Sequence, residues 1–312
     1  MTESVIAARG LRKSYGRTDA LRGLDLTVQE GEVFGFLGPN GAGKTTTIRI
    51  LLDLIRPSGG SAQVVGLDPR RDGVAVRSRV GYLPGDFLVN GRQSGQELLT
   101  YLANLRGGVP AARITALAER LQLDLRPQIR TLSKGNRQKV GLVQAFMHEP
   151  ELLIMDEPTS GLDPFLQQEF TAMAREVVAD GRTVFMSSHV LSEVQATADR
   201  VGVIDAGVLV SVEDVDMLLA SAARHVEIQF ATSVPGEAFA NLEGVSDLTI
   251  DGRVLACRLD GSADALVKAA AAHTVLSFTS EEPDLEDLFF RRPPSPTRPS
   301  PTPNPPSGGD RR

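Results

Sequence analysis

The sequence predicts an α/β fold with a largely parallel sheet, followed by a smaller α+β domain. From Val5 to about Asp205, short β-branched runs alternate with helical patterns, which is typical of an α/β fold. From about Val208, the pattern changes to short strands with helical stretches between them. The 312 residues, 41% of them hydrophobic, are sufficient for one large domain or two unequal ones.

The apolar runs of the first region predict strands that are buried on both faces, as in a parallel sheet. These runs are "GEVFGFL", "ELLIMD", "RTVFMSS" and "RVGVID". The stretch "LDLTVQEGEVF" alternates instead and turns at Glu30-Gly31, which predicts an antiparallel hairpin beside that sheet. Residues 92–148 lack strand signals and predict a helical subdomain, with helices in "SGQELLTYLANLR", "AARITALAERLQL" and "SKGNRQKVGLVQAFMH".

The C-terminal part divides into a small domain and a tail. We place the first domain at residues 1–223 and the small α+β domain at residues 224–292. Its expected strands are "HVEIQFA", "VSDLTID", "RVLACRL" and "HTVLSFT", and its expected helix is "ADALVKAAAA". Residues 293–312 are rich in Pro and Ser and cannot bury a core, which predicts a disordered, solvated tail.

Composition and charge exclude several classes of protein. The net charge of -6 and the pI near 5.4 argue against nucleic acid as the main partner. Cys257 is the single cysteine, so no internal disulfide can form, and we expect it to be buried as a small apolar residue. No apolar run approaches the ~20 residues that cross a bilayer, and the N-terminus lacks a signal-peptide pattern. We therefore expect a cytoplasmic chain, which another protein must anchor if it works at a membrane.

The stretch "FGFLGPNGAGKTTTIRILL" predicts a strand, a phosphate-binding loop and a helix. Its glycines let the backbone amides face an anion, and the helix adds its N-terminal dipole. Lys44 should reach the β- and γ-phosphates, and the Thr45 hydroxyl should bind Mg²⁺. The expected nucleotide contacts in this loop are Asn40, Gly41, Gly43, Lys44, Thr45 and Thr46.

Two carboxylates follow the apolar strand in "ELLIMDEP". The end of that strand should place Asp156 beside the phosphate loop, where it would hold Mg²⁺ directly or through water. Glu157 lies one residue further and could polarise a water for in-line attack on the γ-phosphate. The alternative is a solvated pair of carboxylates on a turn.

A second stretch with the chemistry of an anion site is "LSKGNRQK", Leu132 to Lys139. It has a Ser, a Gly and an Asn at the start of a predicted helix, with cationic side chains close behind. Ser133 and the amides of Gly135 and Asn136 could stabilise an anion there. The alternative is a capped helix with a basic flank.

Taken in order, these motifs resemble those of a nucleotide-binding subunit of the ATP-binding cassette family. The order is Tyr15, "GPNGAGKTT", "LSKGNRQK", "LLIMDEP", "SGLD" and His189 in "MSSHV", and the resemblance covers Val5 to about Ala223. The pair "LSKGN" and "LLIMDEPTSGLDP" is specific, because other phosphate-loop NTPases lack it. The resemblance implies a P-loop NTPase cassette that hydrolyses ATP with Mg²⁺, with Glu157, His189 and Lys44 as catalytic residues.

The same resemblance implies a homodimer in which two cassettes face each other head to tail. Ser133, Gly135 and Asn136 of one chain would close over the ATP that the phosphate loop of the other chain holds. This answers why one chain carries two anion-binding motifs, since two chains then complete two sites. ATP would drive closure, and loss of the γ-phosphate would let the dimer open.

Further roles come from the resemblance, and each has a plainer alternative. Tyr15 should stack on adenine; otherwise it is a half-exposed aromatic residue. His189 should contact the γ-phosphate and Glu157 as a switch; otherwise ordinary hydrogen bonds satisfy it. Asp163 should lie at the dimer seam, a role that is compatible with capping the helix that begins at Pro164.

The chain departs from the family pattern at two places. The family usually has a Gln after the strand that precedes the helical subdomain, but here "RVGYLPGDFLVNGR" has Gly85 at that position and Asp86 next. Either Asp86 takes over part of the polar role, or it is solvated and the loop is only a mechanical contact. In the second motif, Lys134 and Asn136 stand where Gly and Gln are commoner, and both are compatible with phosphate binding.

The YLPG loop, the small C-terminal domain and the closing "PDLEDLFF" resemble ATPase subunits of daunorubicin-resistance-type exporters. That implies an integral membrane permease as a separate chain, a place at the cytoplasmic face of the membrane, and export of a drug, antibiotic or lipid-like molecule.

A soluble cassette ATPase acting on nucleic acid or ribosomes is the alternative. The negative net charge disfavours this alternative, and so does the presence of a single cassette without a long coiled coil. A non-hydrolysing subunit would lack Glu157 or His189. The role of residues 224–292 stays open between dimer contact, regulation and protection of the permease interface.

Overall fold

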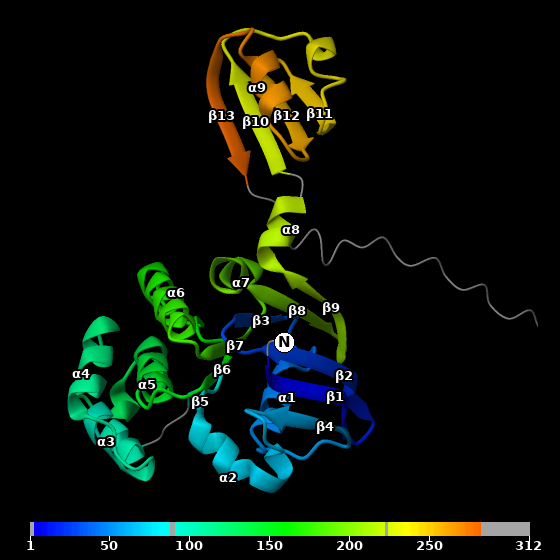
Figure 1. Cartoon of the computed structure of the whole chain (residues 1–312). Helices are drawn as coiled ribbons and strands as arrows, with labels where there is room; N and C mark the ends of the chain where they lie inside the picture. The colour runs from blue at the N-terminus through cyan, green and yellow to red at the C-terminus, as the bar shows by residue number, and fades with distance from the viewer. Residues whose placement is uncertain (1–2, 88–90, 222–223, 282–312) are drawn as a thin grey trace, which may run out of the picture. The chain divides into compact units, whose positions relative to one another are not determined.

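A computed structural model describes residues 3–87, 91–221 and 224–281 of the chain (Figure 1). Contacts within it divide the chain into two units, Met1–Ser221 and Ala222–Arg312. The stretch "PDLEDLFF" and the tail of residues 293–312 lie outside the described residues. The domain boundaries given above therefore stay predictions for the C-terminal end of the chain.

The main sheet of the first unit has six strands in the order β5-β6-β7-β3-β8-β9 (Figure 1). All neighbours pair in parallel except β8 and β9, which are antiparallel. Every residue of β3, β6 and β7 is buried, as the apolar runs predicted. The strands are β3 (Val33–Leu37), β5 (Val80–Leu83), β6 (Leu152–Asp156), β7 (Thr183–Ser188), β8 (Arg200–Asp205) and β9 (Val208–Asp214).

A second sheet in this unit is antiparallel and corrects the predicted hairpin. It has the order β2-β1-β4, with β1 (Ser4–Tyr15), β2 (Thr18–Gln29) and β4 (Gly59–Val64). The hairpin joins β1 to β2, whereas the turn at Glu30-Gly31 carries the chain from β2 into β3 of the other sheet. β2 has one buried face, whereas β3 is buried on both faces. This difference agrees with their places in two different sheets.

Helices fill the remainder of the first unit, and the predicted helical segment is found there. Between residues 92 and 148, the described helices α3, α4 and α5 each lie close to a predicted stretch, and the short helix η1 was not predicted. Ser94 begins α3 with a capping box that includes Glu97. The helices are α1 (Lys44–Leu51), α2 (Pro69–Arg79), α3 (Gly95–Leu105), α4 (Ala111–Arg120), η1 (Ile129–Thr131), α5 (Lys134–Phe146), α6 (Pro164–Ala179), α7 (Leu191–Thr197) and α8 (Val215–Ser221).

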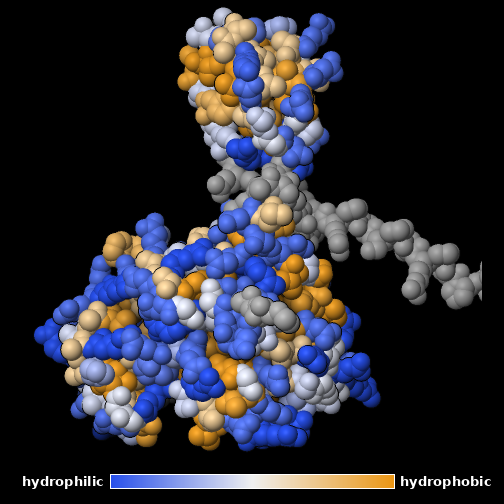
Figure 2. Space-filling view, in the orientation of Figure 1, coloured by the Kyte–Doolittle hydropathy of each residue, from blue (hydrophilic) through white to orange (hydrophobic). Residues whose placement is uncertain are grey.

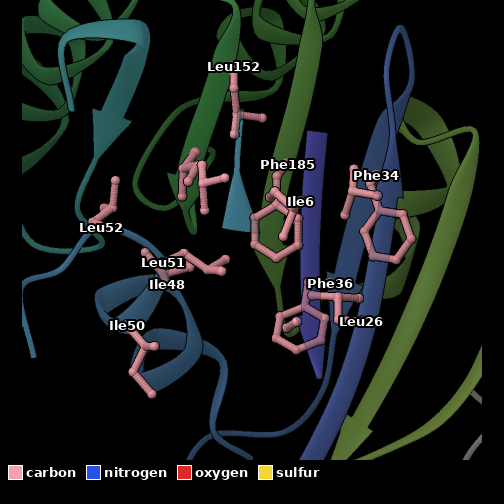
Figure 3. Close-up of a cluster of buried hydrophobic side chains, with 14 of the residues drawn as sticks. Ile6, Leu26, Phe34, Phe36, Ile48, Ile50, Leu51, Leu52, Leu152 and Phe185 are labelled. Carbon is pink, nitrogen blue, oxygen red and sulfur yellow. The ribbon is translucent and has the colours of Figure 1, made fainter. Parts of the chain in front are cut away.

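One hydrophobic core lies between the two sheets and holds α1 (Figure 3). The ring of Phe185 packs 5.9 Å from that of Phe34 and 5.5 Å from that of Phe36. Ile48 and Leu51 bury the inner face of α1 in the same cluster. Since α1 directly follows the phosphate loop, this packing determines where the loop sits relative to the strand ends.

The second unit has its own antiparallel sheet and its own core. Its strands lie in the order β11-β12-β10-β13, and its helix is α9 (Asp264–Ala270), with a short helix η2 (Gly236–Ala238). Cys257 is 1% exposed in the core, as expected for a lone apolar cysteine. The strands are β10 (Arg224–Phe230), β11 (Val245–Asp251), β12 (Val254–Leu259) and β13 (Val275–Glu281). None of the helices in the described part of the chain is long and apolar enough to cross a membrane.

Candidate nucleotide-binding site

The phosphate loop lies between the carboxyl end of β3 and the start of α1, and its glycines are required by geometry. Gly41 and Gly43 have φ of +84° and +114°, which other residues rarely adopt. A Cβ at Gly38 would lie 2.2 Å from the carbonyl oxygen of Ile204, so a side chain cannot fit there. Gly43 begins α1 without a side-chain cap. The first amides of α1 are therefore free of side-chain competition for an anion.

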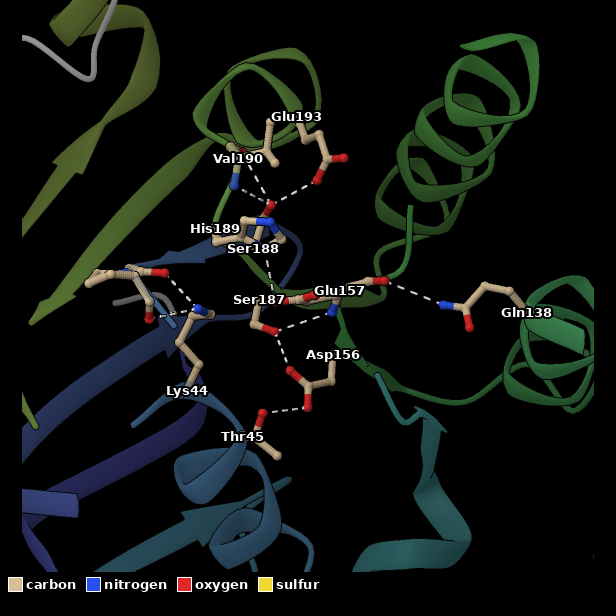
Figure 4. A network of polar contacts seen from close by, with 12 residues as sticks. Lys44, Thr45, Gln138, Asp156, Glu157, Ser187, Ser188, His189, Val190 and Glu193 are labelled. Atoms are coloured by element: carbon tan, nitrogen blue, oxygen red, sulfur yellow. Dashed lines mark hydrogen bonds and ion pairs between the residues drawn. The ribbon is translucent and has the colours of Figure 1, made fainter. Parts of the chain in front are cut away.

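Lys44 is buried beneath this loop, with 6% of its surface exposed. Its Nζ donates hydrogen bonds to the carbonyl oxygens of Gly38 and, at 3.2 Å, Pro39 (Figure 4). Burial lowers the pKa of Lys44, while the nearby carboxylates of Glu157 and Asp156 act in the opposite direction. The loop thus holds a cation beside two acidic groups. Of the other predicted contacts, Asn40 and Gly41 are exposed, and Thr46 is half-buried.

Asp156 ends β6 and is held by two hydroxyl groups (Figure 4). The Thr45 hydroxyl donates to its Oδ2 at 2.8 Å, and the Ser187 hydroxyl donates to its Oδ1 at 2.6 Å. No cluster of three or more His, Cys, Asp or Glu among the described residues could hold a metal. The pair Thr45 and Asp156 instead fits Mg²⁺, which binds through one or two protein oxygens and keeps water and phosphate ligands.

Glu157 and His189 form a pair beside this carboxylate. Glu157 has a left-handed backbone with φ of +51°, and its amide donates to the carbonyl oxygen of Ser187 at 3.1 Å. The Oε1 atom of Glu157 lies 2.9 Å from Nδ1 of His189, and the two side chains are 28% and 44% exposed. Both are therefore accessible to a ligand. The fold brings these two residues together with Lys44, Thr45 and Asp156, as the sequence predicted for one site.

The second anion motif lies at the start of α5 and is open to solvent at Ser133. The Ser133 hydroxyl accepts a hydrogen bond from the amide of Asn136 at 3.2 Å, so it also caps the helix. A Cβ at Gly135 would lie 2.8 Å from the carbonyl oxygen of Gly161, which allows no side chain. Within the described part of the chain, no hydrogen bond or ion pair joins this motif to the phosphate loop.

Tyr15 and Asp163 occupy positions that agree with both of the readings given for each. The Tyr15 side chain is 49% exposed at the end of β1, and the Lys13 ammonium lies 4.9 Å from its ring centre. Asp163 caps α6 by accepting a hydrogen bond from the amide of Leu166 at 3.0 Å. Their roles toward a nucleotide and a partner stay predictions.

The loop that departs from the family pattern lies beside Asp156. A Cβ at Gly85 would be 3.5 Å from both the carbonyl oxygen and Oδ2 of Asp156, an ordinary contact distance. Asp86 is exposed and has no hydrogen bond or ion pair among the described residues. Gly85 thus lies beside the predicted metal ligand, whereas the Asp86 side chain is exposed.

Two residues of the site were missed in the sequence. Ser187 pairs with Asp156 in the parallel register of β6 and β7, and its hydroxyl also accepts a hydrogen bond from the amide of Glu157 at 3.3 Å. Gln138 is 2% exposed on α5 and donates to the carbonyl oxygen of Glu157 at 3.3 Å. A polar residue at the end of a buried strand was the available signal for Ser187. Gln138 lies within the second anion motif, but its burial and its contact with Glu157 are visible only in the structure.

Comparisons with known proteins agree with these motifs. The family model for ABC transporters matches residues 21–160. The daunorubicin resistance ATP-binding protein DrrA3 of Streptomyces coeruleorubidus is 35% identical over 302 residues, which cover 94% of each chain. The linearmycin resistance ATP-binding protein LnrL of Bacillus subtilis is 31% identical over 92% of this chain and 97% of its own.

A solved structure of an ATP-binding subunit of an ABC transporter matches with a TM-score of 0.63 and 27% identity, over 69% of this chain and 91% of that one. Nothing in the comparisons supports the alternative of a cassette ATPase that acts on nucleic acid or ribosomes. The matches to DrrA3 and LnrL each span more than 90% of both chains. The chain therefore belongs to the ABC transporter family, as an ATP-binding subunit that hydrolyses ATP.

Proposed function

We propose that two copies of this chain close head to tail on two ATP molecules. The observation that carries this proposal is the division of the site in one chain. The phosphate loop lies with Asp156, Glu157 and His189, whereas exposed Ser133 has no hydrogen bond or ion pair to that loop among the described residues. A second copy would supply its Ser133 motif to the open side of the nucleotide, and the two-fold symmetry completes both sites.

Hydrolysis follows from the chemistry of the same side chains. Glu157 accepts a proton from the attacking water, the new P–O bond forms at the γ-phosphorus, and the bond to the β-phosphate oxygen breaks, giving ADP and phosphate. His189 orients Glu157 through the 2.9 Å contact, and Lys44 stabilises charge on the phosphate oxygens. Thr45 and Asp156 would hold Mg²⁺, which supplies further stabilisation of that charge.

We further propose that the subunit drives export of a drug or antibiotic through a separate integral membrane permease. The relatives reported above are named for resistance to daunorubicin and linearmycin. The permease would anchor the chain at the cytoplasmic face of the membrane, and we expect no nucleic acid partner. A cavity of about 340 Å³ between α3 and the loop after β5 is a candidate contact for the permease. Its apolar lining includes Leu54, Phe87, Leu98 and Leu102.

The test of the sandwich is the variant Glu157→Gln in the full chain with MgATP. Loss of the Glu157 carboxylate should stop ATP hydrolysis but leave ATP bound. Size-exclusion chromatography with light scattering should therefore show a stable dimer. The control is Glu193→Gln, which alters a carboxylate that accepts a hydrogen bond from Ser188 and lies outside the proposed reaction. A monomeric Glu157→Gln variant with ATP bound would contradict the proposal.

The permease contact has its own test. Leu102→Asp places a charge in the groove, so co-purification with an integral membrane protein should be lost while ATP hydrolysis by the isolated subunit is retained. Tyr101→Asp is the matched control, because Tyr101 is 59% exposed on the same helix and does not line the groove. Equal losses for both variants, or no loss for Leu102→Asp, would place the permease contact elsewhere.

A further inference from the structure

The two edges of the sheet in the second unit differ in how they are protected from further pairing. Strand β11 forms one edge and strand β13 the other. β11 has a register shift between Ser246 and Thr249, and Asp247 at the shift has φ of +49° and is paired with Arg258. Bulges and charges of this kind prevent a sheet edge from pairing with another strand. This edge is therefore protected.

The β13 edge lacks these features over most of its length. Residues 275–280, "VLSFTS", contain no charge and no proline, and all six are exposed. The one register shift against β10 lies near the start of the strand, between the partners of Gln229 and Phe230. On the side away from β10, β13 pairs with no other strand of the described residues. No strand of the described residues covers its outer backbone groups, which could therefore pair with a further strand.

The side chains of β13 also indicate a missing neighbour. Phe278 is paired with Ile228, which is wholly buried, so both residues lie on the face of the sheet that carries the core. Phe278 is nevertheless 42% exposed, and Leu276 is 60% exposed. Of the described residues that form this core or pack against it, none belongs to β13. Figure 2 shows hydrophobic residues at the margin of the small unit where Figure 1 places β13.

We propose that β13 pairs with β13 of a second copy of this chain, antiparallel and centred on Phe278. This register makes the edge self-complementary, as a two-fold contact requires. Phe278 would face Phe278 of the second copy on the core side, where an aromatic pair would cover both exposed rings. Ser277 would face Thr279 of the second copy on the other face, where their hydroxyls can form a hydrogen bond. No like charges within residues 275–280 would meet.

This contact is independent of the ATP sandwich, because it lies wholly in the second unit and requires no nucleotide. It gives residues 224–281 a specific role as a second dimer contact. Two four-stranded sheets would join into one, so the two copies could stay associated when the cassettes open after hydrolysis. Such a contact would raise the effective concentration of one cassette near the other.

The test is disulfide formation in the full-length chain without nucleotide. Phe278→Cys places two thiols opposite each other in the proposed register, so an oxidant should give a covalent dimer. In Ser280→Cys, the two thiols would be about 14 Å apart along the strands and should not form a bond. The native Cys257 is buried and its raised pKa reduces its reactivity, so the unaltered chain serves as a blank. Crosslinking of Phe278→Cys that does not exceed that of Ser280→Cys would overturn the proposal.

A second measurement compares dimerisation of the unaltered chain, in which Phe278 is kept, with that of variants in which Phe278 carries a charge. In Phe278→Lys, like charges would meet at the centre of the contact, so sedimentation without nucleotide should show dimerisation weakened by about tenfold or more. Val267→Lys is the control, because Val267 is a similarly exposed apolar residue, at 47%, on α9. A mixture of Phe278→Lys with Phe278→Glu should restore the dimer. Unchanged dimerisation of Phe278→Lys, or no recovery in the mixture, would count against the register.

Discussion

Replacing Ser187 by alanine should weaken both the stability of the cassette and its use of Mg²⁺. The Ser187 side chain is wholly buried, and its hydroxyl donates to Oδ1 of Asp156 at 2.6 Å. Asp156 is 4% exposed, so water cannot replace a lost donor without rearrangement. After the substitution, Asp156 would keep only its hydrogen bond from Thr45 among those described.

The magnitude follows from the charge and burial of the acceptor. A hydrogen bond to a charged group contributes about 1.5–3 kcal/mol, so we expect a loss of about 2 kcal/mol in the free energy of unfolding. In a unit of this size, that corresponds to a fall of about 4–8 °C in Tm. Because the partner of a metal ligand also orients it, the Mg²⁺ affinity in ATP hydrolysis should fall by about 10- to 100-fold.

The assay combines differential scanning calorimetry with Mg²⁺ titration of ATP hydrolysis. Ser188→Ala is the matched control, because Ser188 is 1% exposed and its hydroxyl donates to Glu193 at 2.7 Å instead of to Asp156. We expect the control to lower Tm and to leave the Mg²⁺ dependence unchanged. The reasoning would be refuted by a Tm fall of less than about 1 °C in Ser187→Ala, given the expected scale. An equal Mg²⁺ effect in both variants would refute it as well.

Three further predictions concern groups outside this pair. Burial and nearby Arg106 lower the pKa of His148 from 6.5 to about 4, so between these pH values the unfolded chain binds a proton that the native state does not. The free energy of unfolding should therefore fall as the pH drops from 6.5 towards 4. In urea titrations at several pH values, His148→Gln should make this pH dependence flatter. Arg120 of α4 donates to both carboxylate oxygens of Glu176 on α6, at 2.6 and 2.7 Å. Loss of these bonds in Arg120→Gln should loosen the helical segment that carries the second anion motif. Steady-state kinetics should then show a KM for ATP raised about two- to fivefold, with little change in kcat. Asp86→Ala should keep ATP turnover within about twofold of the unaltered chain, since Asp86 is exposed and unpartnered in the described part; a tenfold loss would assign Asp86 a polar role instead.

The sequence was sufficient to predict the phosphate loop and the strands that carry the site. Uninterrupted apolar runs identify buried parallel strands because such strands have no polar face. The carboxyl ends of neighbouring parallel strands meet at one edge, so polar residues that end those strands were expected at one place. Asp156 was found in this way, and Ser187 at the end of the next strand carried the same signal.

The predicted hairpin failed for a physical reason. Alternation over β2 describes one buried face correctly, but it does not say which strand lies alongside. The turn at Glu30-Gly31 is compatible with a hairpin and with passage between two layers. The choice depends on the long-range pairing of β2 with β1 and of β3 with β7 and β8, which no local pattern contains.

By itself, the sequence determined the chemistry of this protein: the glycines of the phosphate loop, the carboxylates that follow β6 and the family to which the chain belongs. These are local features, because the spacing of a few residues on one strand, turn and helix produces them. Only the tertiary structure decided which groups hold Asp156, that Gly85 lies beside it, and that β13 forms one edge of the sheet of the described strands. Each of these depends on contacts between segments far apart in the chain, and packing of whole layers, not local spacing, determines such contacts.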